Sequence, residues 1–232
     1  MIHFFYTRFN TQIPNEVWNS FYQYLPLEAI QRTKNYRRWE DQHAFLLGRL
    51  LLMECFNKIG ISRNAIFDLK YNEFGKPFLN DDVDFSISHS GNFVVCAIGQ
   101  KIKLGIDIEK ITDIDIRDYQ DIMTKEEWFQ INIQENPLKS FFRFWTMKES
   151  IIKAEEKGLS IPLKEINILS NKVLYNNKSW HLIELILNEN ICTTLASNIA
   201  NPNLHCYEVD FYQGLKEIKT VQNKIKKIAL SF

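Results

Sequence analysis

Two acidic residues are spaced for metal binding in the segment Leu104-Gly105-Ile106-Asp107-Ile108-Glu109. Side chains alternate across a β-strand, so we expect Asp107 and Glu109 on one face and the apolar side chains on the other. Adjacent carboxylates repel unless a cation lies between them, and Mg²⁺ binds such oxygens together with water and substrate phosphates. An exposed strand with no ligand would show the same alternation, so this segment alone leaves both interpretations open.

A third carboxylate, Glu149, lies in the helical segment Trp145-Thr146-Met147-Lys148-Glu149-Ser150, with Lys153 one turn later. Helical periodicity places Trp145, Glu149 and Lys153 on one face. An acid and a lysine on that face would suit a metal-bound diphosphate. Glu149 and Lys153 would equally suit an ordinary i,i+4 surface pair, worth about 0.3–0.5 kcal/mol.

Basic and hydroxyl-bearing residues precede both segments. The turn-rich stretch 72–77 places Lys76 between Gly75 and Pro77, and a strand further on ends in Ser88-His89-Ser90. Glycine and proline fix a tight backbone path, which would direct Lys76 toward a phosphate. The serine and histidine lack a convincing acidic partner and a nucleophile elbow, so a Ser-His protease is not supported.

The overall charge gives no reason to expect a nucleic-acid partner, because 28 basic residues balance 28 acidic ones among 232 residues. Anion recognition would therefore depend on local clusters. One such cluster contains basic side chains that would either bind an anion or form a solvated helix face: Arg32, Lys34, Arg37, Arg38 and Arg49.

No signal peptide or apolar run of ~20 residues is found. The four cysteines form no C-x-x-C pair, so we expect a cytoplasmic protein with reduced thiols.

The elements that must position these residues follow a repeated order. We expect helices at 26–58 and 115–157, the second broken near 135–137, and a further helix at 215–232 packed on the body, with a membrane-surface helix as the alternative. Strands are expected at 3–9, 66–71, 84–90, 93–98, 104–109, 165–169, 180–187 and 191–196. The repetition predicts an α+β protein of two similar β-α-β-β subdomains related by a pseudo-twofold axis. We place the subdomains at 1–103 and 104–232, with a ligand cleft between them.

Taken in order, the motifs resemble the 4'-phosphopantetheinyl transferase superfamily, in the monomeric class that activates peptide and polyketide synthetases (the surfactin-synthetase-activating type). The resemblance runs from about residue 32 to residue 160. Each motif is weak alone, whereas their order and spacing together are highly specific. The motifs are Gly75-Lys76-Pro77 with Ser88-His89-Ser90, Gly105-Ile106-Asp107-Ile108-Glu109, and Trp145-Thr146-Met147-Lys148-Glu149-Ser150 with Lys153.

This resemblance implies transfer of 4'-phosphopantetheine from coenzyme A to a serine of an apo acyl or peptidyl carrier protein, releasing adenosine 3',5'-bisphosphate. It implies Asp107, Glu109 and Glu149 as ligands of Mg²⁺, and Glu149 and Lys153 as catalytic residues. Either Glu149 or a metal-bound water would be the base. The implied contacts of coenzyme A are Lys148 and Lys153 at the diphosphate, and Lys76, Ser88, His89 and Arg32 at the 3'-phosphate. A monomer with no nucleic-acid or membrane partner is expected.

The chain departs from the family pattern at His43-Ala44, where relatives often carry a basic residue, so the 3'-phosphate would be held either by fewer charges or by Arg49 or Arg37 instead. The segment 111–123 follows the acidic strand and holds more apolar side chains than one helix face can bury. It would either receive the carrier or pack as an ordinary loop on the body. A metal-dependent phosphohydrolase and a non-catalytic coenzyme A-binding regulator remain the alternative functions.

Overall fold

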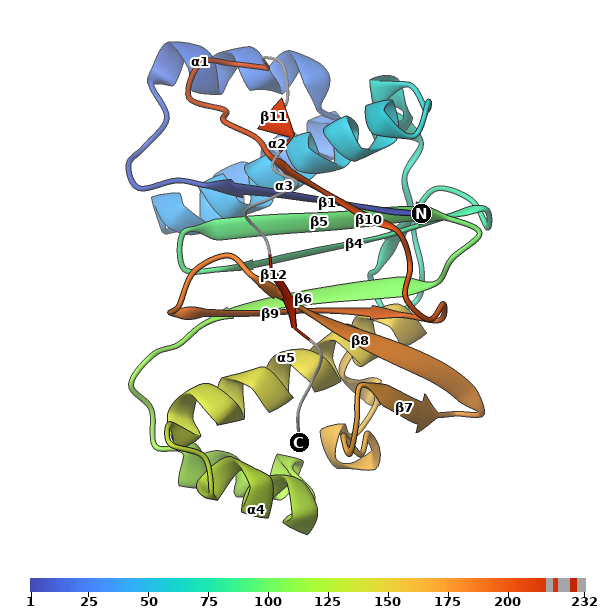
Figure 1. Ribbon diagram of the computed structural model, residues 1–232. Coiled ribbons are helices and arrows are strands. Elements are labelled where there is room, and N and C mark those ends of the chain that lie inside the picture. The colour runs from blue at the N-terminus through green and yellow to red at the C-terminus, as the bar shows by residue number, and fades with distance from the viewer. Residues whose placement is uncertain (216–218, 221–225, 229–232) are drawn as a thin grey trace.

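The chain folds into four layers, in the order helices, sheet, sheet, helices (Figure 1). The structure is a computed structural model and describes residues 1–215, 219–220 and 226–228. The first half contains β1 (Ile2–Arg8), α1 (Asn15–Ser20), α2 (Leu27–Asn35), α3 (Trp39–Lys58), β2 (Lys70–Tyr71), β3 (Pro77–Phe78), β4 (Val83–Ser90) and β5 (Phe93–Gln100). The second half contains β6 (Leu104–Lys110), α4 (Lys125–Asn132), α5 (Pro137–Glu155), β7 (Lys172–Tyr175), β8 (Lys178–Ile186) and β9 (Ile191–Ser197).

Both halves pair their strands in the same way. In the first half β5 lies between β1 and β4, and in the second half β9 lies between β6 and β8, with every one of these pairs antiparallel. The long helix of each half, α3 or α5, connects the first and second of these three strands and covers the outer face of its sheet (Figure 1). The predicted α+β class and the repeated β-α-β-β order are confirmed.

Three apolar cores hold the layers together. The first lies between the first sheet and its helices and includes Phe5, Leu50 and Phe56. Another lies between α5 and the second sheet, and the third fills the space between the two sheets, where alternate residues such as Phe4 and Ile106 meet. Because each fully buried side chain of this size contributes about 1.5–3 kcal/mol, these cores fix the position of β4 against β6.

The C-terminal part of the chain returns to the first sheet. β10 (Leu204–Glu208) pairs in parallel with β1, and β11 (Lys219–Thr220) pairs with β10. β12 (Lys226–Ile228) pairs with β8 in the second sheet. The subdomain boundary between residues 103 and 104 stays a prediction. It assigned β10 and β11 to the second subdomain, whereas both strands pair in the sheet of the first half. Much of the helix predicted at 215–232 lies outside the described residues, and it is wrong for the two described segments, which are strands.

Several local predictions differ from the structure. The start of the helix predicted over 115–157 is a 3-10 helix at Ile116–Ile122, and α4 begins only at Lys125. The helix predicted over 26–58 is two helices, because Tyr36 and Arg38 have extended backbones and α2 folds back on α3. Of the strand predicted over 66–71, only Lys70–Tyr71 forms, after a 3-10 helix at Arg63–Asp68 that begins where the Ser62 hydroxyl accepts the N–H of Asn64. No strand forms at 165–169, which instead contains the end of a 3-10 helix at Leu163–Glu165 followed by a loop.

Candidate active site

Two edge strands, β4 and β6, lie side by side and are joined by side chains of β4. The carboxylate of Asp84 accepts the N–H of Leu104 at 2.8 Å, and the hydroxyl of Ser86 accepts the N–H of Ile106 at 3.1 Å. At the far end Ser90 accepts the N–H of Lys110 and donates to Glu109 Oε2 at 2.7 Å. Polar residues at every second position of β4 thus satisfy the open edge of β6. They also hold the acidic strand in register.

Gly105 allows α5 to lie directly on β6. A Cβ atom at Gly105 would fall 2.1 Å from the backbone oxygen of Ser150 and 2.5 Å from the backbone nitrogen of Ala154. No side chain can therefore occupy this position without moving the helix. This close approach brings the face of α5 that carries Lys153 against Asp107.

Lys153 connects the helix to both edge strands. Its Nζ atom donates to Asp107 Oδ1 at 2.6 Å and to the Ser88 hydroxyl at 2.7 Å, and the Ser88 hydroxyl itself donates to Asp107 Oδ1 at 2.9 Å. The second oxygen of the same carboxylate, Asp107 Oδ2, is buried and has no hydrogen-bond partner among the residues that the structure describes. A buried carboxylate oxygen with no partner is costly, so this atom is suited to accept a cation.

Negative charge is crowded around this point. Burial, with the nearby charges of Asp107 and Glu149, raises the pKa of Glu109 to about 7, although the Ser90 hydrogen bond and Lys153 oppose the rise. Burial and the charge of Asp107 also raise the pKa of Glu149, against the influence of Lys153. Buried carboxylates that lie this close to one another form an environment that a divalent cation would stabilise.

The acidic residues fit a Mg²⁺ site that substrate phosphates complete. In the described part of the chain, no three His, Cys, Asp or Glu side chains are arranged to hold a metal ion by themselves. Mg²⁺ does not need such an arrangement, because it commonly takes one or two carboxylates and fills its octahedron with water and phosphate oxygens. The unpartnered Asp107 Oδ2 beside Glu109 and Glu149 supplies that kind of donor set.

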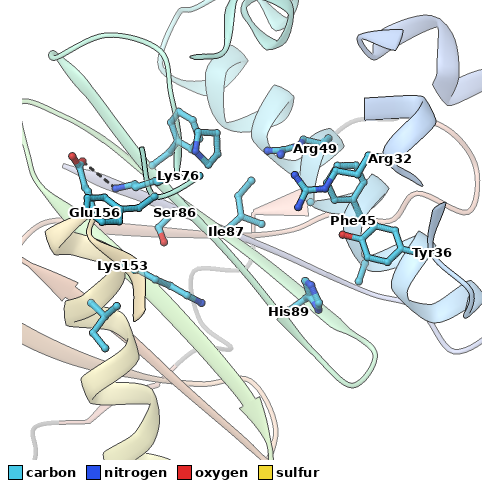
Figure 2. Close-up of a pocket in the computed structure, with 18 residues that line it drawn as sticks. Arg32, Tyr36, Phe45, Arg49, Lys76, Ser86, Ile87, His89, Lys153 and Glu156 are labelled. Carbon is cyan, nitrogen blue, oxygen red and sulfur yellow. Dashed lines mark hydrogen bonds and ion pairs between the residues drawn. The ribbon is translucent and has the colours of Figure 1, made fainter. Parts of the chain in front are cut away.

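A basic cavity of about 340 Å³ lies beside this site (Figure 2). α2 and α3 contribute Arg32, Phe45 and Arg49, the loop before β3 contributes Lys76, and α5 contributes Lys153. The guanidinium groups of Arg32 and Arg49 each lie 5.1 Å from the centre of the Phe45 ring. Within the described residues neither arginine forms an ion pair with a carboxylate, so their charge is available to an anion.

Arg49 is the basic residue that sequence reasoning named only as a substitute. It is buried, which lowers the pKa of its guanidinium, and it donates to the Tyr71 hydroxyl at 3.3 Å. A buried guanidinium with no acidic partner is costly to keep and therefore indicates an anion site. The sequence signal that could have identified Arg49 was its position one helical turn after Phe45 in α3. Ala44 also lines the cavity but carries no charge.

The structure brings together most of the predicted coenzyme contacts. Arg32, Lys76, His89 and Lys153 line the cavity, and Figure 2 shows Lys76 and Lys153 on one side and Arg32 on the other. Burial and the charge of Lys153 lower the pKa of His89. Ser88 does not line the cavity and instead contacts Asp107 and Lys153. These roles in coenzyme binding stay predictions.

Lys148 was wrongly predicted to contact the diphosphate. Its side chain is fully buried, and Nζ pairs with Glu127 Oε2 at 2.8 Å and donates to the backbone oxygens of Leu163 and Ile166. Glu127 Oε1 in turn accepts the N–H of Ile168 at 2.7 Å. Lys148 thus fixes the loop after α5, and the N–H and C=O groups expected in a strand at 165–169 bond to these two side chains instead.

The segment 111–123 packs partly on the second half. Ile111, Ile114, Ile116 and Ile122 are half-buried against the core under α5, and Met123 is fully buried. Tyr119 stays 37% exposed and contacts the ring of Trp145, with the centroids 5.9 Å apart. Most of the excess apolar surface noted in the sequence is therefore covered, and a carrier would meet Tyr119 and the half-buried edges of the isoleucines.

Two family models and several curated relatives match this chain. The model of the 4'-phosphopantetheinyl transferase superfamily matches residues 103–196, and that of the 4'-phosphopantetheinyl transferase N-terminal region matches residues 12–101. The 4'-phosphopantetheinyl transferase gsp of Aneurinibacillus migulanus is 36% identical over 174 residues, covering 74% of this chain and 73% of the relative. The 4'-phosphopantetheinyl transferase Sfp of Bacillus subtilis is 32% identical over 152 residues, covering 64% and 67%.

The chain therefore belongs to the 4'-phosphopantetheinyl transferase superfamily, in its surfactin-synthetase-activating type, and is an enzyme of that class. A third relative, the 4'-phosphopantetheinyl transferase HetI of a Nostoc species, is 28% identical over 187 residues, covering 74% of this chain and 78% of the relative. Among the described residues, no helix has the length and apolar character needed to cross a membrane.

Proposed function

We propose that the enzyme transfers 4'-phosphopantetheine from coenzyme A to a serine of an apo acyl or peptidyl carrier protein and releases adenosine 3',5'-bisphosphate. The observation that carries this proposal is the position of Lys153, whose Nζ lies 2.6 Å from the buried carboxylate of Asp107 at the edge of the basic cavity. A diphosphate there would meet a lysine and an acidic metal site on the same side. Coenzyme A carries such a diphosphate between its nucleotide and its pantetheine arm.

The basic cavity supports binding of the 3'-phosphoadenosine part. Arg32 and Arg49 offer two guanidinium groups with no acidic partner among the described residues, and Lys76 and His89 line the same cavity. Charge-assisted hydrogen bonds from such groups would select a ligand bearing the additional 3'-phosphate. Arg49 thus takes the part that a basic residue at Ala44 would have had. The ring of Phe45 offers an apolar surface between the two guanidiniums.

The chemical step is a displacement at the phosphorus that carries pantetheine. The serine hydroxyl of the carrier attacks, a new P–O bond forms, and the bond to the 5'-phosphate of the nucleotide breaks. Glu149 would accept the proton of the hydroxyl. Lys153 donates to the diphosphate oxygens, where negative charge collects on the leaving nucleotide.

Mg²⁺, bound by Asp107, Glu109 and Glu149 together with the diphosphate, would neutralise the charge of the diphosphate and orient it. Lys153 and Ser88 already hold Asp107 Oδ1, which leaves the buried Oδ2 atom for the cation. Ser90 holds Glu109 in the same way from β4. The chain therefore keeps both carboxylates oriented before substrate arrives, which reduces reorganisation during the reaction.

The test measures adenosine 3',5'-bisphosphate released from coenzyme A and Mg²⁺, with and without apo carrier protein. Release that requires carrier and equals the carrier modified supports the transferase. Release without carrier would support a phosphohydrolase, and binding of coenzyme A with no release would support a regulator. Either of these two results contradicts the proposal.

A further inference from the structure

Glu156 ends α5 in a backbone conformation that usually requires glycine. It is the C-cap residue of α5, with φ 65° and ψ 9°, in the left-handed region. A Cβ atom is unfavourable there, and helices commonly place glycine at such a position. A glutamate that accepts this conformation must be held by contacts of its own.

Those contacts join the end of α5 to the turn that lines the basic cavity. Glu156 Oε1 accepts from Lys76 Nζ at 3.2 Å and from Lys103 Nζ at 2.9 Å. The backbone oxygen of Glu156 accepts from Asn72 Nδ2 at 2.8 Å. One residue at the end of α5 therefore holds both ends of the 72–76 turn of the first half, and Figure 2 shows its carboxylate against Lys76.

The segment that Glu156 holds has little other support. β2 and β3 form a separate two-stranded sheet with only two residues in each strand. A two-stranded ribbon of this size is not stable alone, so its position depends on its tethers. Among the described residues, its polar tethers apart from Glu156 are the ion pair of Lys76 with Asp84 at 2.8 Å and the hydrogen bond between Tyr71 and Arg49. The half-buried Leu69 and Leu79 at its two ends also pack on the first core.

The same segment forms one wall of the cavity. Phe74, Gly75, Lys76 and Pro77 line it opposite α3, and Glu156 lines it from α5. We propose that Glu156 is a positioning residue that holds the 70–78 hairpin as a wall of the coenzyme cavity, so that coenzyme A binds to a preformed site. This inference rests on the proposed function. It predicts an effect on coenzyme affinity, because Asp107 and Lys153 at the reacting centre are held by separate contacts.

The experiment compares Glu156→Gly and Glu156→Gln with wild type. Glycine keeps the left-handed helix end and relieves its strain while removing both lysine contacts, whereas glutamine keeps hydrogen-bonding atoms and loses the charge. Glu208→Gln is the matched control, because Glu208 is similarly exposed (side chain 28% against 33%) and pairs with Arg8 away from the cavity. Transfer is measured with coenzyme A varied at saturating Mg²⁺ and carrier. Hydrogen exchange of residues 70–78 is measured in the ligand-free protein.

We expect Glu156→Gly to raise the KM for coenzyme A about fivefold or more, the scale of losing a partly buried charged contact. We expect kcat within about twofold of wild type, since the reacting groups keep their own contacts. Exchange at 70–78 should become faster, and Tm should stay within about 3 °C because relieved strain offsets the lost contacts. Glu156→Gln should be intermediate, and Glu208→Gln should match wild type.

Wild-type KM and wild-type exchange in Glu156→Gly would overturn the inference. A fall in kcat with unchanged KM would overturn it too, because Glu156 would then act at the reacting centre. Lower Tm together with loss of both kinetic parameters would show a merely structural role. If wild type transfers nothing from coenzyme A, the proposed function fails, while exchange at 70–78 still tests whether Glu156 holds the hairpin.

Discussion

Lys148 and Lys153, five residues apart on α5, point to different surroundings and have different partners. Lys148 Nζ lies 2.8 Å from Glu127 Oε2 in a fully buried pair, whereas Lys153 Nζ lies 2.6 Å from Asp107 Oδ1 beside the cavity. Five residues advance a helix by about 140°, so the two side chains leave α5 on separate faces. The motif that contains both lysines therefore joins a structural contact to a functional one.

Removing the lysine at the cavity should reduce activity rather than stability. Lys153→Met loses a donor to the diphosphate, and we expect kcat to fall about 10²–10³-fold, as for other single donors of this kind. The side chain of Lys153 is 29% exposed, so water can enter the space that it leaves and reach the buried Asp107. The unfolding free energy should therefore change less than it does when the fully buried Lys148 is removed. Steady-state transfer and thermal unfolding of the same preparation check both statements. A loss of Tm that accounts for the loss of activity would contradict them.

Removing the buried Lys148 should reduce stability rather than activity. Lys148→Met leaves the carboxylate of Glu127 buried without a cation, which typically costs about 3–5 kcal/mol of unfolding free energy. Denaturant unfolding measures this loss. Because Lys148 does not line the cavity, the KM for coenzyme A of the folded fraction should equal that of wild type. A raised KM with unchanged stability would restore Lys148 to the coenzyme site.

Gly105→Ala should separate α5 from β6. The added Cβ would meet the backbone of Ser150 and Ala154, which cannot move aside as a flexible side chain can. Overpacking of this kind costs about 1–3 kcal/mol, and it should also move Lys153 away from Asp107. We expect lower stability in denaturant and kcat reduced at least tenfold in the folded fraction. Gly99→Ala is the comparison, because its new Cβ would meet side-chain atoms at 3.3 Å or more. Equal kcat in both variants would contradict this role of Gly105.

Acid should destabilise the protein through His3. Burial, with the nearby charges of His205 and Lys58, lowers the pKa of His3 from its usual 6.5 to about 4. The unfolded chain therefore binds a proton first, so the stability that neutral His3 contributes is complete above pH 6.5 and is lost as pH falls toward 4. His3→Asn can still accept a hydrogen bond from Tyr207 and does not titrate. Its unfolding free energy should fall less than that of wild type between pH 7 and pH 5, and an equal fall would contradict the assignment.

Local patterns in the sequence predicted much of this site. Alternation placed Asp107 and Glu109 on β6, and helical spacing placed Glu149 and Lys153 on α5, because both patterns depend on neighbouring residues alone. The polar alternation from Asp84 to Ser90 was also readable as a strand, although its bonds to β6 were not. Those bonds depend on how the two sheets meet, which no local pattern contains.

The predictions that were wrong depend on contacts distant in the sequence. Lys148 belongs to the motif but is bound by Glu127, 21 residues earlier and on another helix, so spacing could not reveal its direction. The alternation of Ile166 and Ile168 suggested a strand, yet the backbone of these two residues bonds to the side chains of Lys148 and Glu127. Glu156 was passed over because a glutamate at a helix end is ordinary in sequence, and only its backbone conformation and its lysine partners mark it.

The most direct measurement of the central claim is the intact mass of apo carrier proteins after incubation with the enzyme, coenzyme A and Mg²⁺. Acyl and peptidyl carriers are tested, each beside a variant in which the acceptor serine is alanine. The account predicts that at least one carrier gains the mass of one phosphopantetheine, only when its serine is present, and that a chelator or Asp107→Ala abolishes the gain. Modification at wild-type rate in the chelated, metal-free assay, or no gain on any carrier while coenzyme A is hydrolysed, would contradict it.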